Sequence, residues 1–172
     1  MKKLIQLILV AGLATNIAKA QAPDPDTTAR HFIIMASIGN LHEVSSGKLA
    51  EKKATMADVK SFGEMMVTDH SKAQDELMQL ANSRGYQIPP EATATPVPDL
   101  ELSKAKGSDF DRMYIHAMLN GHRSTVSMFQ TYAVTGEDPR VKAFAQKMLP
   151  TLKAHLSAIK AIDDKYKNLA AK

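Results

Sequence analysis

The amino-acid sequence predicts an all-α fold built from four long helices. Four segments carry apolar or small residues at alternating spacings of three and four, which is typical of the buried face of an amphipathic helix. Capping residues separate these segments, and no segment alternates in the manner of a β-strand. A block at residues 59–77 also recurs without gaps at 141–159. The second and fourth helices therefore look like copies, which implies two similar helical hairpins.

The chain opens with the features of a secretory signal peptide, residues 1–20. Two lysines precede an apolar stretch at 4–14, and Ala18 and Ala20 occupy the small-residue positions of a cleavage site. The stretch is too short for a transmembrane helix. We expect cleavage after Ala20 and export to the periplasm or cell envelope of a bacterium. A disordered, proline-rich lead is expected at 21–27.

A single domain, residues 28–168, is expected to follow. Its four helices are predicted at about 28–54, 56–84, 108–135 and 139–167. In the first hairpin, Thr55 and Asp58 have the spacing of a capping box at the start of the second helix. Gly85 is placed to end this helix as a left-handed residue.

The connection between the hairpins is long, since residues 86–107 hold four prolines and show no helical period. Fully extended, it covers roughly 60 Å at ~3 Å per residue. A helix of about 26 residues is only about 39 Å long. The connection can therefore run the whole length of the bundle, as in ferritin-like folds, although a short crossing at one end is also compatible.

Capping residues also define the second hairpin. Ser108 and Asp111 repeat the capping-box spacing and are expected to begin the third helix. Gly136 is expected to end it. Asp138 followed by Pro139 has the pattern of an N-cap and first helical residue for the fourth helix.

Composition excludes several classes of function. The formal charge of +4 falls to +1 when three lysines leave with the signal peptide. No lysine–arginine stripe is interleaved with aromatic residues, so nucleic acid is not an expected partner. The chain has no cysteine, which excludes thiolate chemistry and disulfides. There is no second long apolar run, so membrane insertion is not expected once the signal peptide has been removed. A homo-oligomer is compatible with the sequence, and any protein partner is left open.

One ligand-type residue interrupts the apolar stripe of each helix. These residues are Glu43, His70, His122 and His155. Each lies within about two positions of its helix midpoint, or roughly 3 Å along an axis that rises ~1.5 Å per residue. Midpoints coincide whichever way a helix runs, so the four side chains are expected at one level of the core. One carboxylate and three imidazoles suit zinc, iron, manganese or copper, and we predict one bound transition-metal ion.

Other interpretations of these residues remain open. Without a metal, Glu43 would pair with a protonated histidine in a buried polar network. Copper is favoured if Met66 and Met118, each one turn before a stripe histidine, contribute thioethers, although methionine at such spacing is a common core residue. Asp69, next to His70, is expected either to accept a hydrogen bond from a ligand histidine or to face solvent.

The other polar residues are assigned lesser roles. Apolar residues stand three positions before each stripe histidine, so the Glu-x-x-His pairs of di-iron proteins are missing. A di-iron oxidase or ferroxidase is therefore not expected. Asp111 lies about 16 Å along its helix from His122 and is expected to be a cap. The remaining histidines are expected to face solvent: His31, His42 and His116.

Four blocks of the sequence carry a resemblance to a known family. They are HEVSSGKLAEKKA, VKSFGEMMVTDHSKAQDEL, FDRMYIHAMLNGH and DPRVKAFAQKMLPTLKAHL. Together they resemble the secreted bacterial proteins of domain-of-unknown-function family 4142 over roughly residues 28–163. The resemblance implies a ferritin-like helical bundle behind a signal peptide in a bacterial envelope. It supplies no metal site, because the family has no assigned reaction.

Three functions are compatible with these patterns. The preferred one is an exported metal-binding bundle for sequestration, buffering or sensing. The second is a non-catalytic structural or stress-related envelope protein with a buried polar core. The third is a metal-dependent redox enzyme that acts, for example, on peroxide or superoxide. Metal content after native purification separates the first two.

Overall fold

The computed structural model describes residues 25–94, 96 and 99–170. All regular secondary structure in this part of the chain is helical, so the predicted all-α fold is confirmed. The elements are α1 (Pro25–Lys53), α2 (Ala57–Arg84), the 3-10 turn η1 (Pro90–Ala92), α3 (Leu100–Lys104), α4 (Gly107–Thr135) and α5 (Pro139–Ala170). The predicted signal peptide and its cleavage after Ala20 lie outside the described residues and stay predictions.

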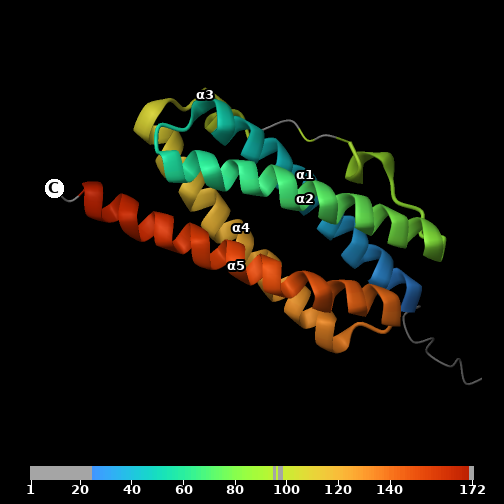
Figure 1. Ribbon diagram of the computed structural model, residues 1–172. Coiled ribbons are helices and arrows are strands. Elements are labelled where there is room, and N and C mark those ends of the chain that lie inside the picture. Colours follow the sequence, from blue (N-terminus) through green and yellow to red (C-terminus); the bar gives the residue numbers. More distant parts are fainter. Residues whose placement is uncertain (1–24, 95, 97–98, 171–172) are drawn as a thin grey trace, which may run out of the picture.

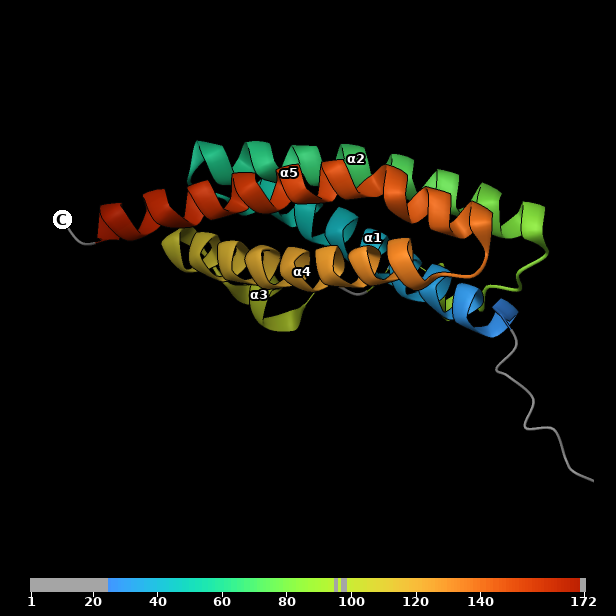
Figure 2. The ribbon, with the colours of Figure 1, turned by 90° about the horizontal axis from the view of Figure 1, so that it is seen from below.

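The four long helices lie side by side along one direction (Figures 1 and 2). The most extensive contacts are those of α1 with α2 and of α4 with α5, which are the two predicted hairpins. The first hairpin is closely packed at two facing glycines. A Cβ on Gly63 of α2 would lie 2.7 Å from Cβ of Ala50 and 2.9 Å from the Gly47 carbonyl oxygen of α1.

The long connection runs along α1 for the whole length of the bundle. Near the start of α1, Arg30 Nε donates to the Gln87 carbonyl at 2.7 Å. Near its end, Lys53 Nζ donates to the Ser103 carbonyl. Because the connection returns to the end of the bundle where α2 began, α2 and α4 run in the same direction. This is the ferritin-like arrangement, and the alternative of a short crossing is wrong.

The connection contains a helix that the sequence did not predict. α3 is short, and Asp99 caps it by accepting a hydrogen bond from Leu102 N at 2.9 Å. Leu102 is buried and packs against the apolar residues of α4 and its neighbours. A single capped turn with one buried anchor needs no helical period, so periodicity could not indicate it.

One predicted helix start and two predicted helix caps are corrected. α1 begins at Pro25 and not near residue 28, because proline is well tolerated in a first helical turn, where its missing N–H has no acceptor. At α2 no side chain of the helix acts as a cap. Instead Asp111 of α4 accepts hydrogen bonds from Thr55 N at 3.1 Å and Met56 N at 3.0 Å. The prediction that Asp111 caps its own helix with Ser108 is therefore wrong, and Asp111 instead holds the backbone at the entry to α2.

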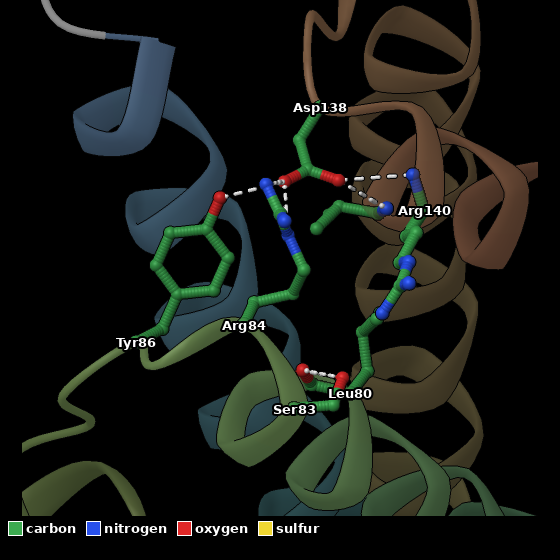
Figure 3. A network of polar contacts seen from close by, with 7 residues as sticks. Leu80, Ser83, Arg84, Tyr86, Asp138 and Arg140 are labelled. Carbon is green, nitrogen blue, oxygen red and sulfur yellow. Dashed lines mark hydrogen bonds and ion pairs between the residues drawn. The ribbon is translucent and has the colours of Figure 1, made fainter.

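The start of α5 follows the prediction and also joins the two hairpins. Asp138 Oδ1 accepts hydrogen bonds from Arg140 N at 2.9 Å and Val141 N at 3.1 Å, so Asp138 is the N-cap. Its other oxygen accepts from Tyr86 Oη at 2.8 Å and from the guanidinium of Arg84 (Figure 3). Burial alone would raise the pKa of Asp138, but these hydrogen bonds together hold it below its ordinary value.

The ends of α2 and α4 also follow the prediction. Gly85 is left-handed, with φ of 72°, and Tyr86 N donates back to the Ala81 carbonyl at 3.0 Å. This is the Schellman pattern that favours glycine. Gly136 ends α4.

The apolar core divides into two clusters along the bundle. The first contains Phe32 of α1, Leu77 of α2 and Phe129 of α4, and the second contains Phe62 of α2 and Phe110 of α4. On every long helix the predicted ligand residue lies, in chain order, between the residues of the two clusters. No described helix is long and apolar enough to span a membrane.

Candidate metal centre

Three of the four predicted ligands meet at one level of the core. His70 of α2, His122 of α4 and His155 of α5 have ring centroids 5.4 to 5.8 Å apart. One nitrogen of each ring lies within 4.8 Å of the other two. The side chains are almost fully buried, with relative exposures of 4%, 1% and 2%. We call these residues the histidine triad.

Each ring of the triad is held from outside by one hydrogen-bond acceptor. The pairs are His70 Nδ1 with Asn40 Oδ1, His122 Nδ1 with the Met118 carbonyl and His155 Nε2 with Asp69 Oδ2, each at 3.0 Å. A backbone carbonyl and a carboxylate can only accept, so His122 Nδ1 and His155 Nε2 carry the ring protons. The amide oxygen of Asn40 favours the same form of His70, with the proton on Nδ1. Such outer acceptors fix the tautomer and orientation of metal-binding histidines.

The second nitrogen of each ring is therefore left with a free lone pair. These atoms are His70 Nε2, His122 Nε2 and His155 Nδ1, and all three are buried with no hydrogen-bond partner among the described residues. Metal–nitrogen bonds of about 2.0–2.1 Å place two ligand nitrogens at most about 4.2 Å apart. The triad therefore fits one ion after a small inward movement of the rings.

Glu43 lies beside the triad and outside its inner face. Its Oε1 is 3.7 Å from His122 Nδ1, the nitrogen that already donates to Met118. Its Oε2 has no hydrogen-bond partner in the described part of the chain. The absence of a side chain at Gly121 makes room for it, because a Cβ there would lie 3.3 Å from Oε1. The structure thus brings the three histidines together and leaves Glu43 adjacent to them.

Burial keeps the triad neutral. Desolvation lowers the pKa of His70 to about 3, with further lowering from His155 and His122. It lowers the pKa of His122 to about 4, although the hydrogen bond to the Met118 carbonyl acts in the opposite direction. It also lowers the pKa of His155, although Asp69 opposes the shift. Neutral imidazole is the form that binds a metal.

Glu43 is also neutral at pH 7, because burial raises its pKa to about 8. The distance of 3.7 Å to His122 is within the range of an ion pair, but the two pKa values place both groups in their uncharged forms at neutral pH. The neutral description is the more physical one, because two buried charges this far apart do not recover their desolvation cost. Burial therefore favours a neutral core over a network based on Glu43 and a protonated histidine.

The remaining sequence predictions can be placed around this centre. Asp69 is 35% exposed in its side chain and accepts from His155, so it combines both roles that were expected of it. Met66 and Met118 are buried in the second apolar cluster. Three histidines are exposed as predicted: His31, His42 and His116.

Asn40 is the contact that sequence reasoning missed. It lies on α1 three residues before Glu43, on the same helix face, and is 7% exposed. A buried amide one turn from a candidate ligand is a usable signal, but it does not say which histidine the amide contacts.

A small cavity borders the triad between α2 and α5. Its volume is about 30 Å³, and its walls include His70, His155, Asp69 and Ala73. A cavity of this size holds a water molecule or a ligand of similar size. Two of the three candidate ligands therefore have space next to them for a small exogenous group.

Known structures share the fold at low sequence identity. CopM in its Cu(I)-bound form is 18% identical, with 80% of this chain and 96% of CopM covered and a TM-score of 0.67. CopM in its Cu(II)-bound form gives a TM-score of 0.66 at 18% identity, over 81% of this chain and 97% of CopM. A DUF305 protein from Streptomyces coelicolor is 11% identical over 84% of this chain and 95% of its own, with a TM-score of 0.68.

Sequence comparison identifies the family directly. No curated protein matches the chain. The model of the domain of unknown function DUF4142 matches residues 14–162, which is most of the chain. The match includes α1, α2, α4, α5 as far as residue 162, and every residue of the candidate centre. This protein therefore belongs to the DUF4142 family.

Proposed function

We propose that this protein binds one transition-metal ion at the histidine triad. The observation that carries the proposal is the convergence of three buried imidazoles, each of which has one nitrogen without a hydrogen-bond partner and another that is held by an acceptor. A buried polar atom without a partner costs about 1–3 kcal/mol. One metal ion would bond to all three nitrogens at once, whereas a single hydrogen-bond donor would satisfy them less completely.

Copper is the first metal to test. Imidazole ligands suit copper, zinc, iron and nickel, and CopM, which shares this fold, has been crystallised with Cu(I), Cu(II) and silver. Glu43, whose pKa burial raises to about 8, lies beside the triad and would supply a compensating negative charge when a cation lowers that pKa. Zinc is the second candidate.

Sequestration or buffering in a bacterial envelope fits this centre better than catalysis. The triad is almost closed to solvent, and the predicted signal peptide would carry the chain out of the cytoplasm. The main alternative is a structural envelope protein, in which the same neutral side chains serve only as a buried polar network.

Metal titration of the processed, chelator-treated protein separates these functions. At a hundredfold excess over its dissociation constant, a bound ion stabilises the fold by about 2.7 kcal/mol. For a domain of this size the melting temperature rises by roughly 2–4 °C per kcal/mol, so a shift of several degrees is expected with Cu(I), Cu(II) or Zn(II), at one ion per chain.

Two alanine variants provide the matched comparison. His155→Ala removes a triad ligand and should abolish the metal-dependent shift, whereas His31→Ala removes an exposed histidine of α1 and should leave it intact. If no metal moves the wild-type transition, or if His155→Ala retains the full shift, the metal proposal is wrong. Equal destabilisation of His155→Ala with and without metal would favour the structural alternative.

A further inference from the structure

We infer that three buried side chains form a continuous series of hydrogen bonds between a carbonyl of the long connection and the ring of His70. The carbonyl sets the direction of each bond, so the series fixes which ring nitrogen of His70 holds the proton. The three side chains are those of Ser37, Gln74 and Asn40, and we call them the relay. The functional meaning of the relay rests on the metal site proposed above, because it leaves Nε2 of His70 free for the ion. The relay residues are positioning residues, since none of them belongs to the triad.

The relay is continuous from the connection to the triad. Ser37 Oγ donates to the Ala92 carbonyl of η1 at 2.6 Å, and Gln74 Nε2 donates to Ser37 Oγ at 2.8 Å. Asn40 Nδ2 donates to Gln74 Oε1 at 3.4 Å, and Asn40 Oδ1 faces His70 Nδ1 at 3.0 Å. The relay side chains are buried, at 0% to 9% exposure.

The direction of every bond follows from the first one. A backbone carbonyl can only accept, so the hydroxyl proton of Ser37 points to Ala92. Ser37 is then left with lone pairs, which orients the amide of Gln74 with its nitrogen towards Ser37 and its oxygen towards Asn40. Asn40 must in turn present its oxygen to His70. The proton of His70 is therefore held on Nδ1.

A reversed relay would block the proposed ligand. If Asn40 turned its amide nitrogen to His70, Nδ1 would have to accept and the ring proton would move to Nε2. Nε2 is the buried nitrogen of His70 that has no hydrogen-bond partner among the described residues and is the one left to bind an ion. The relay thus makes metal affinity depend on a peptide group of the connection. Because such coupling is reciprocal, a bound ion should also stabilise the docking of η1 on α1.

The tautomer of His70 in the metal-free protein is the direct test, read from the side-chain 15N shifts at pH 7.5. The wild type should show the Nδ1–H form. Ser37→Ala removes the source of polarity and should give a mixture with the Nε2–H form. Ser45→Ala is the matched control, because it removes another α1 hydrogen bond to the connection, from Ser45 Oγ to the Pro96 carbonyl at 3.4 Å, but leaves the relay intact.

Affinity for Cu(I) or Zn(II) gives the functional readout. Apparent affinity falls in proportion to the fraction of His70 in the Nδ1–H form, so a mixture of the two tautomers predicts a loss of a few-fold for Ser37→Ala and none for Ser45→Ala. A lost hydrogen bond of merely structural importance would lower stability without changing the tautomer of His70.

Two results would overturn the inference. One is an Nε2–H tautomer of His70 in the wild type, and the other is a Ser37→Ala protein with unchanged tautomer and unchanged affinity. The tautomer measurement uses no metal, so it decides the relay even if the wild type binds no ion, in which case only the proposed function fails.

Discussion

The protonation state of Glu43 can be measured through the stability of the metal-free protein. The perturbation is Glu43→Gln, which keeps the shape of the side chain and removes its titration. We expect the variant to lose much more stability than the wild type between pH 7 and pH 5. The reason is that Glu43 and the histidines respond to pH in opposite directions, and in the wild type the two responses partly cancel.

The buried histidines make the fold less stable as the pH falls. Their pKa values are about 3 for His70 and about 4 for His122 in the fold, against 6.5 in the unfolded chain. A lowered pKa means that stability is present above pH 6.5 and is lost as pH falls towards the folded value. From pH 7 to pH 5 this loss amounts to about 2 kcal/mol for each of the two residues, or about 4 kcal/mol together. The lowered pKa of His155 adds to the loss.

Glu43 makes the fold more stable as the pH falls. Its pKa is raised from 4.5 to about 8, so its contribution to stability is present below pH 4.5 and is lost as pH rises through the folded value. From pH 7 to pH 5 the fold regains about 2.5 kcal/mol through this residue. The wild type should therefore lose about 2.5 kcal/mol less than Glu43→Gln over this interval. Other titrating groups affect both proteins equally and drop out of the difference.

Urea unfolding of both proteins at pH 5 and pH 7, in the presence of a chelator, gives the required free energies. Circular dichroism of the helices is a suitable signal. If the two proteins show the same change between the two pH values, Glu43 is ionised in the fold at pH 7 and the neutral description of the centre is refuted. A larger loss in the wild type than in the variant would also refute it.

Three further substitutions test the fold and the surroundings of the centre. Asp138→Ala removes an N-cap, worth about 0.5–2 kcal/mol, and a charged hydrogen bond to Tyr86, worth about 1.5–3 kcal/mol. The melting temperature should therefore fall by roughly 10 °C, and an unchanged melting temperature would contradict this account. Gly63→Ala would place a Cβ 2.7 Å from a Cβ of α1 and should destabilise by about 1–3 kcal/mol, whereas Gly39→Ala, with nothing within 4 Å, should stabilise by roughly 0.5–1 kcal/mol; equal effects in urea unfolding would contradict the packing argument. Asp69→Ala should lower metal affinity by about 10–100-fold in competition with a chromogenic chelator, and unchanged affinity would show that its hydrogen bond to the triad is dispensable.

The sequence predicted the helices well because their signals are local. The stripe spacing, the left-handed Gly85 and the cap at Asp138 each depend on residues within one or two turns, and the structure confirms them. The length of the connection predicted that it could run along the bundle, but only the hydrogen bonds to α1 decide that it does.

Contacts between distant segments could not be predicted in the same way. Asp111 has the local spacing of a capping box with Ser108, yet its carboxylate caps α2 instead. Asn40 likewise has no local signal that connects it to His70, which lies on another helix. In both cases the partner is chosen by the approach of two helices in space, and the sequence of either helix alone does not contain that information.

The repeated block explains why the centre lies where it does. Position 70 of the first copy aligns with 152 of the second, and position 73 aligns with 155. All four of these residues line the cavity between α2 and α5. Each copy supplies one histidine and one apolar residue, His70 with Ala73 and Leu152 with His155. The two histidines stand at different positions of the repeat, so the partner position is apolar in each case and both rings can turn towards His122 without competing for the same volume.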